Sequence, residues 1–306
     1  MVFDLYFSNE LTNSYTQSNK YKVFGYTIKK NDECNIKTSF DVVFRKDNHK
    51  KTFGKTLIIG GDQGYLGSIL IAGASALKTG NRYVEIFTTK DHSRQIQFNR
   101  PELIIRDSFS TINDSLNDYS CLLIGPGMSE DEWSLSTFEK IIPILKNKMN
   151  SIPIVADAGF LNLLAEESFS YDNWILTPHP GEAAKMLRTN VASIQDNRIS
   201  SAIALREKFG GAVLLKGNKS VIAIEDKIYI CNHGNQSMGT AGMGDCLSGV
   251  LTSFITMLQS GIDYRAILYA IALHSHSADL LSSDKEAVGI LATDVIEKMK
   301  KIINEK

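Results

Sequence analysis

The chain has 306 residues, with 33 Lys and Arg against 34 Asp and Glu, so its formal net charge is −1 at pH 7. Because a protein whose main partner is nucleic acid or an anionic membrane carries a basic surface, this balance argues against both kinds of partner. The hydrophobic fraction of 43% is typical of a globular protein. No stretch approaches the ~18 apolar residues of a membrane span.

Cysteine usage and the first residues bear on the cellular compartment. The cysteines at 34, 121, 231 and 246 stand far apart and form no CxxC pair. This spacing disfavours a disulfide framework and a structural zinc site, so we expect reduced thiols. The first residues lack a basic segment followed by an apolar one, and we therefore expect a cytoplasmic protein.

The chain divides by texture near residue 45. Residues 1–45 are polar and show no sustained periodicity, so we expect an irregular lead-in, followed by one domain at 46–306. In that domain, β-branched or Leu-rich runs alternate with helix-length segments, which predicts an α/β fold with a mainly parallel sheet flanked by helices on both faces. The predicted strands are residues 56–59, 83–87, 121–124, 154–156, 174–176 and 212–215.

Residues 220–231 break this alternation. Two apolar runs flank Glu225 and Asp226 and leave no room for a helix, which predicts a hairpin that we expect at the edge of the sheet. The rest of the chain is predicted to be mostly helical. The predicted helices are residues 245–259, 263–281 and 293–303.

Two glycine-containing loops follow predicted strands. The loop from Gly60 to Ser68 lets the backbone approach a ligand, although a tight turn explains its glycines equally well, and its spacing is not GxGxxG. Gly125, Pro126 and Gly127 follow the run 121–124, where ligands bind in open α/β sheets. Such a triplet also occurs in ordinary loops.

A third loop, residues 177–182, holds His179 between two prolines. The prolines keep the imidazole outside a regular ladder, where it can donate a hydrogen bond to a substrate. A structural histidine in a turn is the alternative. Glu182 lies in the first turn of the next predicted helix, where a carboxylate complements the helix dipole.

The fourth loop has glycines at 239, 242 and 244 directly before Asp245. Small residues at a helix start expose backbone N–H groups that bind anions. Asp245 is then placed to accept a proton from a hydroxyl that attacks a phosphoryl group, and a simple helix-start carboxylate is the alternative. The loop lacks the Lys-Ser or Lys-Thr of a P-loop.

Taken in order, these loops resemble the ADP/ATP-dependent NAD(P)H-hydrate dehydratase family, the carbohydrate-kinase-like domain of the ribokinase-like superfamily. The resemblance runs from about residue 49 to the carboxyl terminus. The segments that carry it are His49-Lys50 with Gly54, and residues 59–62, 100–103, 124–127, 157–158, 161–164, 176–182, 215–217, 234–235 and 242–245.

The resemblance implies a lyase that repairs hydrated NADH or NADPH. It phosphorylates the ring hydroxyl with ADP or ATP, and we favour ADP, with Mg²⁺ bridging the phosphates through water and nucleotide. Phosphate is then eliminated. Asp245 is implied as the catalytic base that also contacts the substrate. The other implied residues are Ser68, Gly127 and His179 at the substrate, Lys216, Gly217, Asn218, Lys219, Ser220 and Gly244 at the nucleotide, and Ala241, Gly242, Met243 and Gly244 in an anion hole.

The resemblance also implies a homotetramer and an epimerase on a separate chain, because 45 residues cannot hold that domain. The sequence departs from the family pattern at three places. Ser68 replaces the usual Ala, Ala241 replaces the first glycine of a Gly-Gly pair, and Asn81 with Arg82 replaces small residues. We expect Ala241 to keep a negative φ, because Gly242 and Gly244 can supply the unusual dihedrals.

Two alternatives remain open from the residues alone. A small-molecule kinase of the hydroxymethylpyrimidine or hydroxyethylthiazole type shares the glycine-rich loop and Asp245. A nucleotide-binding protein without turnover is the other, and Ala241 is its only hint. The loop at 177–182 together with Gly125 to Gly127 favours the dehydratase.

Overall fold

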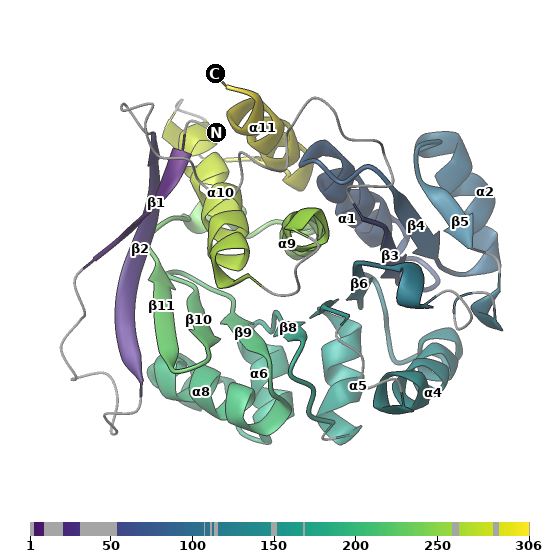
Figure 1. Cartoon of the computed structure of the whole chain (residues 1–306), viewed down its shortest axis with the longest axis horizontal. Coiled ribbons are helices and arrows are strands. Elements are labelled where there is room, and N and C mark those ends of the chain that lie inside the picture. Colours follow the sequence, from purple (N-terminus) through teal and green to yellow (C-terminus); the bar gives the residue numbers. More distant parts are fainter. Residues whose placement is uncertain are drawn as a thin grey trace.

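A mainly parallel sheet between two layers of helices forms the body of the molecule (Figure 1). The computed structural model describes residues 3–8, 21–30, 54–106, 108–110, 112, 116–147, 152–167, 169–258, 263–283 and 288–305. Within them the sheet has eleven strands in the order β1-β2-β11-β10-β9-β8-β7-β6-β3-β4-β5. Seven neighbouring strands from β5 to β9 run parallel, which confirms the expected fold class.

Every strand predicted after residue 54 is present. The parallel strands are β3 (Thr56–Ile59), β4 (Val84–Phe87), β5 (Ile104–Arg106), β6 (Cys121–Ile124), β7 (Ile154–Ala156), β8 (Trp174–Leu176) and β9 (Ala212–Leu215). The predicted hairpin is β10 (Val221–Ile224) with β11 (Lys227–Cys231). Only β5 was not anticipated, because it is three residues long and its residues are not fully buried.

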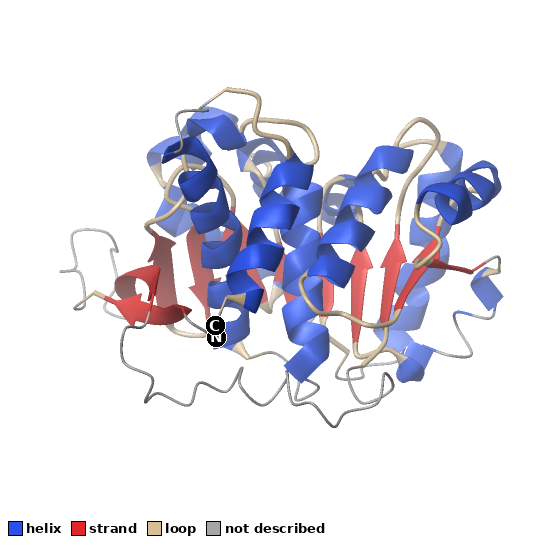
Figure 2. Ribbon diagram, turned by 90° about the horizontal axis from the view of Figure 1, so that it is seen from above, coloured by secondary structure: helices blue, strands red, loops and turns tan. Residues whose placement is uncertain are grey.

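The helices pack on both faces of the sheet, as Figure 2 shows from above. Their bounds are α1 (Leu66–Lys78), α2 (Lys90–Asn99), α4 (Glu132–Asn147), α5 (Gly159–Glu167), α6 (Pro180–Leu187), α7 (Val191–Asp196), α8 (Arg198–Phe209), α9 (Met243–Leu258), α10 (Tyr264–Ser283) and α11 (Ala292–Asn304). Short 3-10 helices are η3 (Leu116–Asp118) and η4 (Gln236–Met238). None of the helices in the described ranges has the length and apolar character that a bilayer span requires.

Two hydrophobic cores lie on opposite faces of the sheet. In β3, Leu57 and Ile59 belong to the core shared with α4, α5, α6 and α8, whereas Ile58 belongs to the core shared with α1, α9, α10 and α11. Side chains of a strand alternate between faces, so a strand buried on both faces reads as one apolar run. This is why the parallel strands were recognisable from sequence.

The structure corrects the expectation that residues 1–45 are irregular. Within the described residues, β1 (Phe3–Phe7) and β2 (Lys22–Lys30) join the sheet, and β2 pairs in parallel with β11. The hairpin is therefore not at the edge. Val23, Tyr26 and Ile28 of β2 are buried, but their partner strand lies about 200 residues away, and local periodicity does not report such a pairing.

Several sequence-based interpretations concern residues that the structure does not describe. The boundary at 45 and 46, Cys34, His49 and Lys50 lie outside the described residues. The cysteines at 121, 231 and 246 are buried free thiols.

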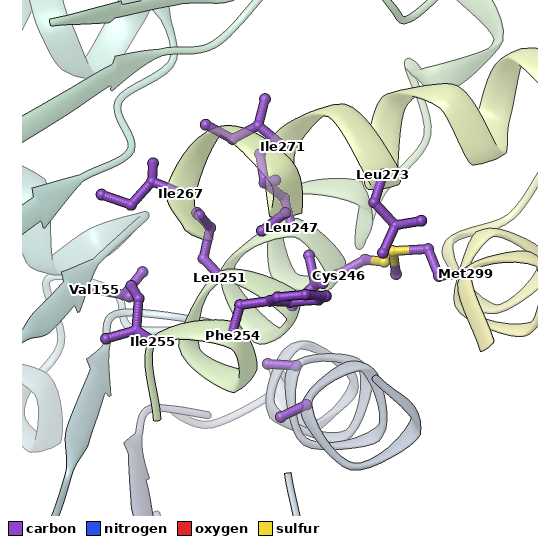
Figure 3. Packing of buried hydrophobic residues seen from close by; sticks show 14 of the residues in the cluster. Val155, Cys246, Leu247, Leu251, Phe254, Ile255, Ile267, Ile271, Leu273 and Met299 are labelled. Carbon is purple, nitrogen blue, oxygen red and sulfur yellow. The ribbon is translucent and has the colours of Figure 1, made fainter. Parts of the chain in front are cut away.

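Helix α9 is enclosed by other helices and the sheet. Figure 3 shows Leu251 and Phe254 of α9 in one cluster with Ile267 of α10 and Met299 of α11. Against α1 the approach is close enough for backbone contact. A Cβ at Gly249 would lie 2.3 Å from the carbonyl oxygen of Ala72, so only glycine fits. This packing fixes the position of the helix.

We predict that Gly249→Ala destabilises the fold by about 1–3 kcal/mol, because the added methyl group overpacks a backbone contact. Urea unfolding measures the change. Gly67→Ala is the matched control, since nothing lies within 4 Å of its added Cβ. In α1 that change should stabilise by about 0.5 kcal/mol. Similar losses for both variants would contradict the packing explanation.

Candidate active site

The loops singled out in the sequence gather at one edge of the sheet. They follow β3, β6, β8 and β9, which are parallel, so their carboxyl ends share an edge. The first turn of α9 brings Asp245 to the same place. Ligands of open α/β sheets bind at this edge.

Asp245 is a partly buried carboxylate with an unusual acidity. Burial raises the pKa of Asp245 to about 6, and repulsion from Asp157 adds to the increase. A hydrogen bond from Ser68 and the charge of Lys216 oppose the rise without cancelling it. A carboxylate with a pKa close to neutrality is suited to general-base catalysis, because it can both accept and release a proton.

Asp157, which directly follows β7, forms an ion pair with Lys216. Lys216 Nζ lies 2.7 Å from Asp157 Oδ1, which also accepts the N–H of Ala158 at 2.9 Å. The hydroxyl of Ser248 donates to Asp157 Oδ2. Although burial by itself raises the pKa of Asp157, the charge and hydrogen bond of Lys216, with help from Ser248, lower it overall. Asp157 is therefore ionised, and both of its carboxylate oxygens accept hydrogen bonds.

Lys216 is shared among several acids. Glu182 Oε2 lies 3.9 Å from its ammonium, and Asp245 also attracts it. Burial works against the charged form, but Asp157 and Glu182 raise the pKa of Lys216 overall. A Cβ at Gly244 would lie 3.5 Å from Lys216 Nζ, so the ammonium lies directly beneath the glycine-rich loop.

His179 has the structural role that the sequence left open as an alternative. It caps α6, because Nδ1 accepts the N–H groups of Gly181 at 2.9 Å and Glu182 at 3.3 Å. Glu182 in turn accepts the backbone N–H of His179 at 2.7 Å, which completes a capping box. A neutral ring that accepts at Nδ1 carries its proton on Nε2. Nε2 lies 3.4 Å from Glu182 Oε1, and 56% of the side chain is exposed, so a ligand can still approach the ring.

The loops after β3 and β6 are joined by backbone hydrogen bonds. Asp62 N donates to Gly127 O at 2.8 Å, and the Asp62 carboxylate accepts from Ser129 and Ser134 at 2.7 and 2.6 Å. Asp62 therefore holds the loop together. A Cβ at Gly127 would lie 3.0 Å from that of Ser68, so these two predicted substrate residues are neighbours beside Asp245.

The glycine-rich loop takes its unusual dihedral at Gly242. Its φ is +84°, and an added Cβ would lie 2.5 Å from Ile71 Cδ1. Among the described residues, positive φ outside glycine is confined to Ala158, Arg188, Lys219 and Glu225. Ala241 thus has an ordinary φ, as we expected. The Met243 side chain is buried, so Met243 can offer a ligand only its backbone.

The predicted nucleotide segment separates into two parts. Lys216 belongs to the buried charge cluster, whereas Asn218 and Lys219 line a cavity of about 600 Å³. Residues from the α7–α8 junction, including Arg198, also line this cavity. Arg198 Nη2 donates to Leu215 O at 3.1 Å and so fixes the start of the segment, while Ser220 Oγ donates to Gly217 O at 3.0 Å.

Comparison with known proteins agrees with this geometry. The family model described as NAD(P)H-hydrate dehydratase matches residues 56–301. The chain belongs to the NAD(P)H-hydrate dehydratase family. It is 34% identical over 262 residues to the bifunctional NAD(P)H-hydrate repair enzyme Nnr of Escherichia coli, covering 85% of this chain and 49% of that protein. The chain spans about half the length of the bifunctional relatives that it matches.

Two further relatives are matched over most of their length. The ADP-dependent (S)-NAD(P)H-hydrate dehydratase of Neisseria meningitidis is 31% identical over 256 residues, covering 81% of this chain and 82% of that protein. The ADP/ATP-dependent NAD(P)H-hydrate dehydratase of Bacillus subtilis, co-crystallised with ATP and Mg²⁺, superposes with a TM-score of 0.72 at 27% identity. It covers 84% of this chain and 91% of that chain.

Two residues of this family site were not assigned a role from sequence. Asp157 was noted only as part of a motif, and Glu182 only as a helix-start carboxylate. Their signal was positional, because each follows the carboxyl end of a buried strand, where side chains from neighbouring strands converge. The structure brings Ser68, Gly127 and Asp245 together around this charge cluster, and leaves Asn218 and Lys219 in the adjoining cavity.

We predict that Ala241→Gly, which restores the glycine pair of the family, destabilises the chain by about 0.4–1 kcal/mol. The φ of Ala241 is ordinary, so glycine relieves no strain and only increases the entropy of the unfolded chain. Thermal and urea unfolding test this. A more stable variant would show that Ala241 is strained.

Proposed function

We propose that the chain is an ADP- or ATP-dependent NAD(P)H-hydrate dehydratase, a hydro-lyase that restores NADH or NADPH from the hydrated cofactor. The observation that carries the proposal is Asp245, whose pKa is raised to about 6 at the amino terminus of α9, directly behind a glycine-rich loop. The family and the names of the Neisseria and Bacillus relatives support the same reaction.

In the first step, the oxygen of the ring hydroxyl attacks the terminal phosphoryl group of the nucleotide. Asp245 accepts the proton of that hydroxyl. The bond from phosphorus to the nucleotide breaks, and the charge that develops faces the amino-terminal N–H groups of α9. In the second step the carbon–oxygen bond breaks as phosphate leaves. Loss of a proton from the neighbouring ring carbon then restores the double bond.

The substrates take opposite sides of Asp245 in this proposal. The hydrated ring lies against Ser68, Gly127 and the Nε2–H of His179. The nucleotide lies along residues 217–220 and Gly244, with its base toward the cavity of about 600 Å³. Mg²⁺ arrives with the nucleotide and takes phosphate and water oxygens as ligands, because Asp157 and Glu182 are already occupied by Lys216.

The activity is tested by incubating the purified chain with hydrated NADH and ADP or ATP, and following the absorbance of the reduced nicotinamide. We expect recovery of the reduced cofactor that depends on nucleotide and Mg²⁺. Hydroxyethylthiazole and hydroxymethylpyrimidine with ATP serve as competing substrates. Their phosphorylation, without repair of hydrated NADH, would replace the proposal with a small-molecule kinase. Tight nucleotide binding without either reaction would leave a binding protein.

We predict that Asp245→Asn lowers kcat by at least ~10²-fold, because the general base is lost while the shape is kept. Nucleotide affinity should change little. In the wild-type enzyme, kcat/KM should fall below pH 6, where the base becomes protonated. Retention of more than about a tenth of the wild-type kcat would contradict the role of general base.

The same variant should be more stable than wild type at pH 8. A raised pKa means that the fold favours protonated Asp245, so this contribution is present below the unfolded pKa and is lost as pH rises through about 6. Asparagine imitates the protonated form, and the gain should be about 1–3 kcal/mol. Asp62→Asn is the matched control. Hydrogen bonds from Ser134 and Ser129 outweigh burial and lower the pKa of Asp62, so that variant should lose stability.

We predict that His179→Ala raises KM for the hydrated cofactor more than KM for the nucleotide. It should also cost about 1 kcal/mol of stability, because the cap of α6 is lost. His179→Asn separates the two effects, since asparagine is a good cap but lacks the imidazole Nε2–H. Normal kinetics in the asparagine variant would reduce His179 to a structural residue.

A further inference from the structure

A cluster of metal-binding side chains lies apart from the loops of the active site. His233 follows β11, whereas His276 and Asp279 are three residues apart on α10 and therefore share a face of that helix. One ligand atom from each of the three lies within 4.8 Å of the others. The two imidazole rings are 4.6 Å apart between centroids. None of these residues has a part in the proposed reaction.

We propose that His233, His276 and Asp279 form a binding site for a divalent transition-metal ion of the Zn²⁺ class. His233 Nδ1 is 3.1 Å from Asp279 Oδ2, close to the separation of about 3.3 Å between two ligands of tetrahedral zinc. Binding therefore requires mainly that the His276 ring turn toward the other two ligands. A fourth position remains for water.

The chemistry of the donors selects the class of metal. Two imidazoles and one carboxylate suit Zn²⁺ and its neighbours, whereas Mg²⁺ and Ca²⁺ require mostly oxygen ligands. The Asp279 carboxylate is held in place by the backbone N–H of Gly234 at 3.1 Å and by Asn235 Nδ2 at 2.9 Å.

Groups around the cluster orient two of the three ligands. His233 Nε2 accepts the N–H of Ile28 at 3.1 Å, so the ring proton lies on Nδ1, toward Asp279. When Nδ1 binds a metal, this proton moves to Nε2, where Thr27 Oγ1 at 2.6 Å can accept it. Asp279 Oδ1 accepts from Asn235 Nδ2 at 2.9 Å, which leaves Oδ2 toward His233. Such outer contacts fix the orientation of metal ligands in proteins. Lys298 on α11 places a positive charge near His276.

The position of the cluster indicates what the metal does. Thr27 and Ile28 belong to β2, which precedes the residues matched by the family model. His233 begins the segment that runs through η4 to the glycine-rich loop. A metal ion bound by the three ligands would therefore connect this segment to α10 and, through the contacts of His233 with β2, to the amino-terminal strand. Such a connection would stabilise the folded chain.

Metal binding is tested on the full chain after removal of metals with a chelator. Calorimetric titration with ZnCl₂ should show one equivalent per chain, and Tm should rise by roughly 5 °C at a free Zn²⁺ concentration 100-fold above Kd. Mg²⁺ and Ca²⁺ should give no such shift. Co²⁺ should give visible absorption of tetrahedral intensity, a readout that does not depend on any variant or on activity.

His233→Gln and His276→Gln should each weaken Zn²⁺ binding by at least about 100-fold. Loss of a residue that only contacts a ligand already weakens metal binding by about 10–100-fold, and loss of a ligand should cost at least as much. His179→Gln removes an exposed histidine elsewhere and should keep the stoichiometry. Circular dichroism and Tm without metal show whether each variant folds. No stoichiometric Zn²⁺ binding by the wild type, equal effects of Mg²⁺, or unchanged binding in His276→Gln would overturn the site. None of these results bears on the dehydratase reaction.

Discussion

One buried ammonium shared among carboxylates determines the chemistry of this edge of the sheet. Lys216 Nζ lies 2.7 Å from Asp157 and 3.9 Å from Glu182, so two carboxylates other than Asp245 already interact with its positive charge. Removing one partner of such a buried pair costs about 3–5 kcal/mol, because the other charge remains without compensation. Because Ser248 and Ala158 also donate hydrogen bonds to Asp157, that carboxylate stays ionised. Burial and then repulsion from Asp157 raise the pKa of Asp245 to about 6, because Lys216 offsets them only in part.

Rigid packing of the fold fixes the positions of Asp157, Lys216 and Asp245. Asp157 and Lys216 follow β7 and β9, which are separated by one strand of the parallel sheet, while Asp245 comes from α9, which is held against α1 at Gly249. Ser75 of α1 also donates to Cys246 O at 2.7 Å, one residue after Asp245. A helix amino terminus normally stabilises a carboxylate, so the raised pKa means that burial and Asp157 outweigh that effect. The two large cores supply the stability that this arrangement requires.

The sequence predicted those parts of the fold that depend on local pattern. The runs 57–59 and 121–124 are apolar throughout because both faces of the sheet are covered, and this pattern is visible without knowledge of the partner strands. Strand β2 was missed because its partner β11 is distant in sequence and Gly25 interrupts its pattern. In the site, Asp245 was visible from the glycines before it. The importance of Asp157 was not, because it arises from Lys216, 59 residues later.

The buried pair also explains which positions of the glycine-rich loop must be glycine. If Lys216 left its place to reach a phosphate, Asp157 and Glu182 would lose their positively charged neighbour, so its ammonium supports the loop from beneath. In the proposed reaction, favourable potential for the phosphates must then come from the backbone N–H groups of the α9 terminus and from Mg²⁺ bound to the nucleotide. Such backbone binding requires glycine at position 242, where φ is +84° and an added Cβ would lie 2.5 Å from Ile71 Cδ1. At Gly244 an added Cβ would make only an ordinary contact, 3.5 Å from Lys216 Nζ, and Ala241 has an ordinary φ, so neither position shares that requirement.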